Sequence, residues 1–211
     1  MKLYVINPNY IEYLKQFDSK VPNVDYDNRF KLFLGKVNIS DDAPMSYYIP
    51  LTSGSKDKFE TMKDRLDFIK ITDPIDGEII GAIDINNMIP APDKVVSDFT
   101  YDMIRDNSDF TTKEERDKYY KMSMNELEYL NKMEDHIIGN AKTIFSIYRS
   151  KSKQFENLRK RCCRFIDLYS KAMEYNDVLN YEMNNLIEDI TDQFLESNNN
   201  QRNIQGKGKE L

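Results

Sequence analysis

The sequence predicts an α+β protein in which a small, strongly twisted antiparallel sheet or barrel is followed by a helical C-terminal half. Short β-branched and aromatic runs separated by turn residues fill residues 1–100. From residue 111 onwards, apolar residues recur every three or four positions, as in amphipathic helices. With 211 residues, 40% of them hydrophobic, the chain can form one generous core.

The strand-rich part begins with a predicted strand at 2–6. Asn7 and Pro8 then have the pattern of a helix cap followed by proline in the first turn, which predicts a short helix to Phe17. A turn is expected over 73–77, where the sequence reads DPIDG. The other predicted strands cover residues 31–39, 46–51, 66–71 and 78–86.

Two capping-box patterns, Thr112 with Glu115 and Ser123 with Glu126, predict helix starts in the helical part, residues 111–196. A long amphipathic helix is expected after the second, as far as Tyr148. Later apolar seams are Phe155, Leu158, Cys162, Phe165 and Tyr169, then Leu179, Met183, Leu186, Ile190 and Phe194. We expect one domain over 1–196 and a disordered polar tail over 197–211.

Composition excludes several classes of protein. The apolar runs are too short for a membrane span, and the N-terminus lacks the apolar core of a signal peptide. The two cysteines, Cys162 and Cys163, are adjacent and cannot build a disulfide framework, so a cytoplasmic location is expected. With one histidine, His136, and no metal or phosphate-loop motif, the sequence predicts no metal and no cofactor.

The net charge of −6 hides a concentrated basic segment. Residues 149–164 carry a local charge of +6, whereas residues 165–196 carry −7. If one helix spans the basic segment, its cations face away from the apolar seam and form a phosphate-binding stripe, the alternative being an ordinary solvated face. The stripe comprises Arg149, Lys153, Lys160 and Arg164.

The remaining candidates for chemistry are hydroxyl, phenol and ammonium groups, most of them in the stretch PLTSGSKDKF at 50–59. Each also has a structural explanation: a core tyrosine, an edge-strand lysine or hydroxyls that cap a turn. The candidates are Tyr10, Lys31, Thr52, Ser53, Lys56 and Lys58.

Five motifs occur in the order seen in one family. They read MKLYVINPNYIEYLKQFDSKVPN at 1–23, KLFLGKV at 31–37, YYIPLTSGSK at 47–56, GAIDINNMIP at 81–90 and LRKRCCRFIDLYSKA at 158–172. On these motifs the chain resembles the ToxN/AbiQ family of type III toxin–antitoxin endoribonucleases over roughly residues 1–175.

The resemblance implies a twisted antiparallel sheet of the Kid/CcdB type. It also implies metal-independent RNA cleavage that leaves 2′,3′-cyclic phosphate and 5′-hydroxyl ends. The implied partner is the toxin's own antitoxin, a repeated RNA pseudoknot that the enzyme processes and that inhibits it in a closed toxin–RNA hetero-oligomer. Such systems often protect bacteria from phage.

The family's functional positions correspond here to Tyr10, Lys31, Thr52 and Ser53. Relatives place a lysine two residues after the hydroxyl pair, behind a proline. This chain has Gly54 and Ser55 there, so either Lys56 or Lys58 takes that role.

Lysines and hydroxyls suit this chemistry, because cleavage without a metal requires an oriented 2′-hydroxyl and cations aimed at the developing phosphorane charge. Proton transfer has no assigned residue, since hydroxyl and ammonium groups titrate far from neutrality. Two alternatives stay open: a non-catalytic RNA-binding module, which would retain RNA without cutting it, and a helical protein-interaction protein, which would not depend on nucleic acid.

Overall fold

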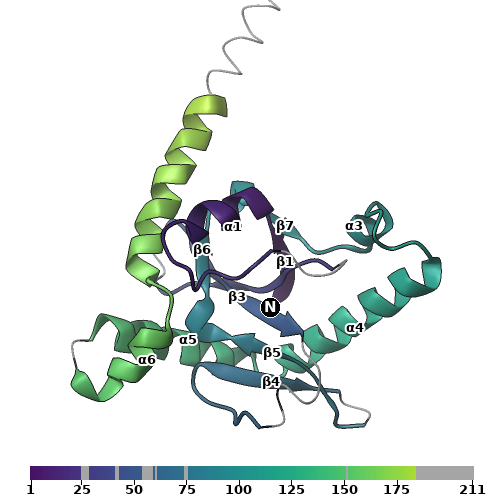
Figure 1. Ribbon diagram of the computed structural model, residues 1–211, viewed down its shortest axis with the longest axis horizontal. Helices are drawn as coiled ribbons and strands as arrows, with labels where there is room; N and C mark the ends of the chain where they lie inside the picture. Colours follow the sequence, from purple (N-terminus) through teal and green to yellow (C-terminus); the bar gives the residue numbers. More distant parts are fainter. Residues whose placement is uncertain are drawn as a thin grey trace, which may run out of the picture. The chain divides into compact units, whose positions relative to one another are not determined.

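The computed structural model describes residues 1–24, 29–40, 43–53, 59, 61–73, 76–150 and 152–183 (Figure 1). Residues 1–172 form one compact unit, and a second unit begins at Met173. All of the strands described below belong to the first unit. The described residues of the second unit, 173–183, are helical.

Seven strands of the described residues form an antiparallel sheet, which confirms the predicted α+β class. Six of them lie in the order β4-β5-β3-β2-β1-β7, and β6 also pairs with β3. The strands are β1 (Lys2–Ile6), β2 (Leu32–Val37), β3 (Ser46–Ser53), β4 (Phe68–Thr72), β5 (Ile79–Asp84), β6 (Ile89–Ala91) and β7 (Val96–Asp98).

Strand β3 organises the sheet because it pairs along its whole length. One edge carries β2, and the other carries β5 at residues 51–53 and β6 at residues 46–48. The short 3-10 turn η1 (Ile85–Asn87) separates β5 from β6, and a second 3-10 turn, η2 (Asp93–Val95), leads into β7. Residues 52 and 53, predicted to follow the strand, are in fact its last two residues.

The first helix, α1 (Pro8–Lys15), confirms the predicted cap. The side chain of Asn7 accepts a hydrogen bond from the backbone N–H of Asn9, and proline occupies the first turn. Tyr10, Ile11 and Leu14 form its buried face, which follows from their three- and four-residue spacing. Figure 1 shows α1 next to β6.

The predicted long helix after Ser123 is wrong in its start and in its continuity, whereas its predicted end at Tyr148 agrees with the end of α5 to within one residue. A helix α4 (Lys113–Asn131) runs through Ser123, and a separate helix α5 (Glu134–Arg149) follows. Thr112 does form a capping box with Glu115. Ser123, in contrast, donates its hydroxyl hydrogen to the carbonyl of Tyr119 one turn earlier, so its spacing to Glu126 has no capping role.

The basic segment is not one helix either. After Arg149 the described chain forms a 3-10 turn, η3 (Lys153–Phe155), and the short helix α6 (Glu156–Arg161). It is then extended to residue 164, and another helix begins at 165. The expected apolar seam is therefore divided between two helices. The remaining helix, α3 (Tyr101–Arg105), was not predicted, and neither were β6 and β7.

Two buried aspartates connect the later elements to the first half of the chain. Asp18 accepts hydrogen bonds from the backbone N–H of Lys20 and of Arg164. The carboxylate of Asp67 pairs with Arg65 at 3.2 Å and with Arg161 at 2.9 Å. Each aspartate thus has the partners that a buried charge requires.

Cys162 and Cys163 are both buried free thiols, as expected for structural cysteines. Burial raises the pKa of the Cys162 thiol to about 11. Within the part of the chain that the structure describes, no helix has the length and apolar character needed to cross a membrane. The expected last helix beyond 183 and the tail over 197–211 lie outside the described residues.

Candidate functional site

Lys31 is brought beside the end of β3 by the register of the sheet. Phe33 pairs with Pro50, so continuing the antiparallel register two residues sets Lys31 opposite Thr52. Lys31 is only 8% exposed, and its ammonium donates a hydrogen bond to the carbonyl of Leu51 at 2.5 Å. A cation is therefore held at a defined point beside Thr52.

Thr52 is fixed from the other side by β5. It pairs with Ala82, and its hydroxyl donates to a carboxylate oxygen of Asp84 at 3.0 Å. Lys31, Thr52 and Asp84 thus come together from three neighbouring strand segments. Their separation in sequence is large, but the strand register makes them neighbours.

Ser53 ends β3 and pairs with Gly81 of β5. Lys56 and Lys58 lie outside the described residues, so the choice between them stays as the sequence leaves it.

Tyr10 does not join this group. Its ring is fully buried, and its hydroxyl donates to the carbonyl of Pro90 at 2.7 Å. Pro90 pairs with Tyr47, five residues before Thr52, which corresponds to roughly 16 Å along a strand. The ring has no exposed face on which a base could stack, and its contacts are those of a core residue that holds α1 against β6.

The four predicted phosphate-binding cations are all exposed but do not form one helical stripe. Arg149 ends α5, Lys153 lies in η3, and Lys160 lies in α6, where it pairs with Glu156 at 2.7 Å. Arg164 lies in the extended segment and is 3.5 Å from Asp167. The predicted common face depended on a single helix, but Ser150 and Ser152 are not helical and the chain leaves the helix again at 162–164.

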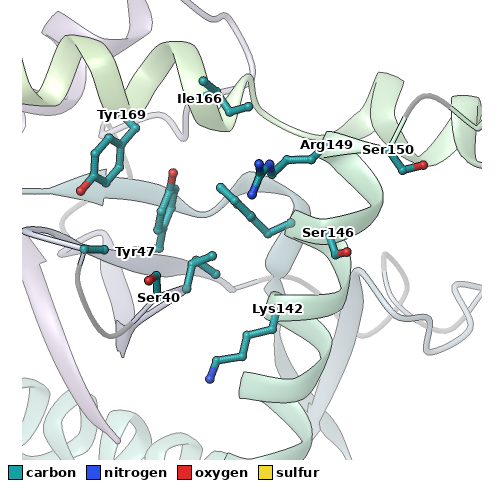
Figure 2. A pocket seen from close by; sticks show the side chains of 11 residues that line it. Ser40, Tyr47, Lys142, Ser146, Arg149, Ser150, Ile166 and Tyr169 are labelled. Carbon is teal, nitrogen blue, oxygen red and sulfur yellow. The ribbon is translucent and has the colours of Figure 1, made fainter.

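Arg149 instead lines a pocket of about 810 Å³ near the first residues of β3. Figure 2 shows the Arg149 side chain beside Tyr47, with the ring of Tyr169 on the far side of Tyr47. The two tyrosine rings are stacked, with centroids 6.0 Å apart. Lys142 contributes a second cation to the lining. Cations and aromatic rings are the groups that bind phosphates and unpaired bases.

Glu126 is a site residue that the sequence analysis missed. It is 4% exposed, lies on the core-facing side of α4, and has a side-chain oxygen 2.9 Å from where a Cβ on Gly81 would stand. Burial raises the pKa of this carboxyl to about 7. The signal available in the sequence was a glutamate at a helical position, seven residues after Tyr119, where an apolar residue is usual.

Among the described residues there is no group of three or more histidine, cysteine, aspartate or glutamate side chains that could hold a metal ion. His136 is exposed, and one of its ring nitrogens is 3.3 Å from the side-chain nitrogen of Asn140.

Comparison with known proteins yields one family. Residues 2–174 match the family model described as toxin ToxN of type III toxin–antitoxin systems. The chain is 26% identical to endoribonuclease ToxN of Bacillus thuringiensis subsp. kurstaki, over 83% of this chain and 84% of that protein. It is also 26% identical to endoribonuclease AbiQ of Lactococcus lactis subsp. lactis, over 83% and 90% respectively.

The fold is similar to solved structures of the same kind. One, from work on selective toxin inhibition by a non-coding RNA pseudoknot, has a TM-score of 0.68 at 23% identity, covering 83% of this chain and 97% of that one. A structure of AbiQ, described as a lactococcal anti-phage endoribonuclease, has a TM-score of 0.64 at 24% identity, covering 83% and 98%. These likenesses show that the sheet and the helices around it are the fold of that group.

Proposed function

Because the chain belongs to the ToxN family of type III toxin–antitoxin toxins, we propose that it is an endoribonuclease that cuts RNA without a metal ion. The products would carry 2′,3′-cyclic phosphate and 5′-hydroxyl ends. The relatives' names support ribonuclease activity, and the chemistry of the described site supports this route to it.

The observation that carries the proposal is the buried lysine at the hydroxyl-bearing strand end. Lys31 is held by the Leu51 carbonyl, and Thr52 is held by Asp84, so both groups are preorganised before any RNA binds. Preorganised cations and hydrogen-bond donors stabilise charge that develops in a transition state without reorganising at that moment.

In this mechanism, the 2′-hydroxyl next to the scissile phosphate attacks phosphorus, and the bond from phosphorus to the 5′-oxygen breaks. The Lys31 ammonium stabilises the negative charge that the phosphorane gains. Thr52 and Ser53 orient the phosphate so that the attacking and leaving oxygens are in line. Orientation of this kind supplies a large part of the rate enhancement in such reactions.

The RNA partner that we propose is a repeated antitoxin pseudoknot, which the enzyme processes and which then inhibits it in a closed assembly. A solved relative is described in terms of inhibition by such a pseudoknot, and another, with a TM-score of 0.61, in terms of a processed non-coding RNA that regulates an antiviral system. The exposed cations Arg149, Lys153, Lys160 and Arg164 would bind its phosphates, and Lys56 and Lys58 would do so beside the cleavage site. A tandem short-repeat array upstream of the gene would encode it.

The decisive experiment is cleavage of RNA by the purified chain in excess EDTA, followed by analysis of both product ends. We expect cleavage to persist and the 3′ ends to resist ligation until the cyclic phosphate has been opened and the resulting phosphate removed. Loss of cleavage in EDTA and its rescue by Mg²⁺ would contradict the metal-independent route. RNA that is retained but never cut would favour a binding module.

A further inference from the structure

The buried face of α4 contains a carboxyl where an apolar side chain is expected. Its buried residues are Tyr119, Ser123, Glu126 and Leu130, which have the spacing of one helical face. The Ser123 hydroxyl is satisfied by the Tyr119 carbonyl. Glu126, in contrast, places an ionisable carboxyl on this face and is only 4% exposed.

Gly81 provides the space that this carboxyl occupies. An ideal Cβ on Gly81 would lie 2.9 Å from Oε1 of Glu126 and 3.4 Å from the backbone carbonyl oxygen of Thr52. Gly81 is also the residue paired with Ser53. Since paired strands lie about 4.8 Å apart and successive residues alternate between the faces of a sheet, the carboxyl is roughly one strand spacing from the end of β3, on the sheet face opposite that of Thr52 and its pair Ala82. In Figure 1, α4 extends beside the ends of β3 and β5.

Among the described residues, two ionisable groups influence this carboxyl. Arg29, from the segment before β2, is a cation that favours the ionised form, and Tyr119 of α4 is a titratable group. From β4 the nearest atom is an Ile71 methyl group, 3.6 Å from the same ideal Cβ position. Desolvation outweighs Arg29, which is why the carboxyl changes its protonation state near neutrality.

We propose that Glu126 is the proton acceptor of the RNA cleavage site and that it acts through one bridging water at the end of β3. The inference rests on the proposed function and adds the group that a site of lysines and hydroxyls lacks. A carboxyl that ionises close to the working pH is the best matched to this task.

The proton transfers balance over the reaction. As the 2′-oxygen bonds to phosphorus, its proton passes to the bridging water, and a proton of that water passes to the Glu126 carboxylate. The departing 5′-oxygen takes a proton from the Lys31 ammonium. Glu126 and Lys31 then return to their starting states by exchange with solvent, so the net reaction neither releases nor consumes protons.

The first test is the pH dependence of single-turnover RNA cleavage in the full chain. We expect the wild-type rate to rise about tenfold per pH unit up to about 7 and then to level off. Glu126→Gln should lack this inflection and be about 10²–10⁴-fold slower at pH 8, with the ratio to wild type shrinking at lower pH. Glu128→Gln, an exposed change on the same helix, should keep the wild-type profile.

Binding separates a catalytic effect from a structural one. An RNA that the wild type cuts, with the 2′-hydroxyl at its cleavage position replaced by hydrogen, should bind Glu126→Gln and wild type with affinities within about twofold. Weakened binding in proportion to the lost rate would mean that the carboxyl supports the shape of the site, and it would overturn the inference.

A second variant moves the carboxyl without removing it. The new Cβ of Gly81→Ala would displace only the flexible end of Glu126, so the protein should fold but lose at least tenfold in rate above pH 7. Gly139→Ala is the matched control, because nothing lies within 4 Å of its ideal Cβ. This pair decides the question even if Glu126→Gln fails to fold.

Two results distinguish the inference from the function on which it rests. If the wild type cleaves RNA but shows no inflection between about pH 6 and 8, or if Glu126→Gln keeps that inflection, Glu126 is not the acceptor and the nuclease function stands. If the wild type cleaves no RNA in any condition, both the proposed nuclease function and the role of Glu126 are contradicted.

Discussion

Lys31 combines two properties that rarely occur together, since it is a cation and is almost completely buried. Lys31→Met should lower the single-turnover cleavage rate by about 10²–10³-fold, because it removes a preorganised charge at the reacting phosphate. Thermal unfolding should change only slightly by comparison, since methionine keeps most of the buried aliphatic stem of the lysine. Lys36→Met, an exposed change on the strand β2 that directly follows Lys31, is the control, and equal rates in both variants would exclude Lys31 from the site.

The second prediction for a single residue concerns Glu126 and the pH dependence of the unfolding free energy. Its pKa of about 7 in the folded protein lies above its ordinary value of 4.5, so folding takes up a proton between these pH values. The stabilising effect of the protonated carboxyl is complete below pH 4.5 and is lost as the pH rises through 7. Relative to Glu126→Gln, the wild type should therefore lose about 3 kcal/mol of unfolding free energy between pH 4.5 and pH 8. Parallel curves from denaturant titrations across this range would contradict the raised pKa.

At the residue scale, Lys31 and Thr52 were grouped in the sequence only through the family resemblance. The register of β2 against β3 sets the two residues opposite each other, and strand patterns alone do not give that register. Glu126 was missed because its three-residue spacing from Ser123 matches a capping box, and only the course of α4 shows that Ser123 lies within a helix. Tyr10 was assigned by resemblance, and its burial depends on contacts with β6, a strand too short to be recognised.

At the scale of elements, the two capping-box patterns on α4 give a direct comparison. Thr112→Ala should destabilise the protein by about 1 kcal/mol, because it leaves the N–H of Glu115 without its side-chain acceptor. Ser123→Ala should cost less, since the Ser123 hydroxyl only adds a second bond to a helical carbonyl. Urea denaturation measures the unfolding free energies of the two variants. A larger loss in Ser123→Ala than in Thr112→Ala would support a capping role for Ser123.

The basic segment, residues 149–164, is divided between several elements. Some of its cations are exposed and available to RNA, whereas Arg161 pairs with a buried carboxylate of the fold. Replacing Lys153, Lys160 and Arg164 together by glutamine should weaken RNA binding and reduce the log–log salt slope by about 0.7–0.9 per lost phosphate contact. Folding should be nearly unaffected, because these side chains are exposed.

Arg161→Gln is the matched contrast within the same segment. It should destabilise the fold, since Arg161 is paired with the buried carboxylate of Asp67. An unchanged salt slope in the triple variant would exclude these three cations from RNA binding and direct attention to Arg149 and its pocket. Sequence periodicity alone could not reveal this division, because the non-helical stretch at 162–164 is held by tertiary contacts such as the Asp18 bond to the N–H of Arg164.

For the whole molecule, the proposed function predicts toxicity. Expression of this chain alone should arrest bacterial growth, and co-expression of the upstream repeat RNA should relieve the arrest. Lys31→Met should also relieve it at equal protein level, whereas Lys36→Met should not. Growth curves with a blot for the protein provide the measurement, and full toxicity of Lys31→Met would contradict the site.

The bonds of Asp18 have a consequence for synthesis on the ribosome. Asp18 leaves the ribosome early, but the N–H of Arg164 that binds it emerges 146 residues later, and the Lys171 carbonyl that binds the Tyr13 hydroxyl emerges 158 residues after Tyr13. Until then the first helix lacks these contacts, and the Asp18 carboxylate keeps only its local donor, the N–H of Lys20. A nascent or prematurely terminated chain should therefore remain unfolded and harmless. Active toxin would therefore form only after Lys171 has been translated and has emerged from the ribosome.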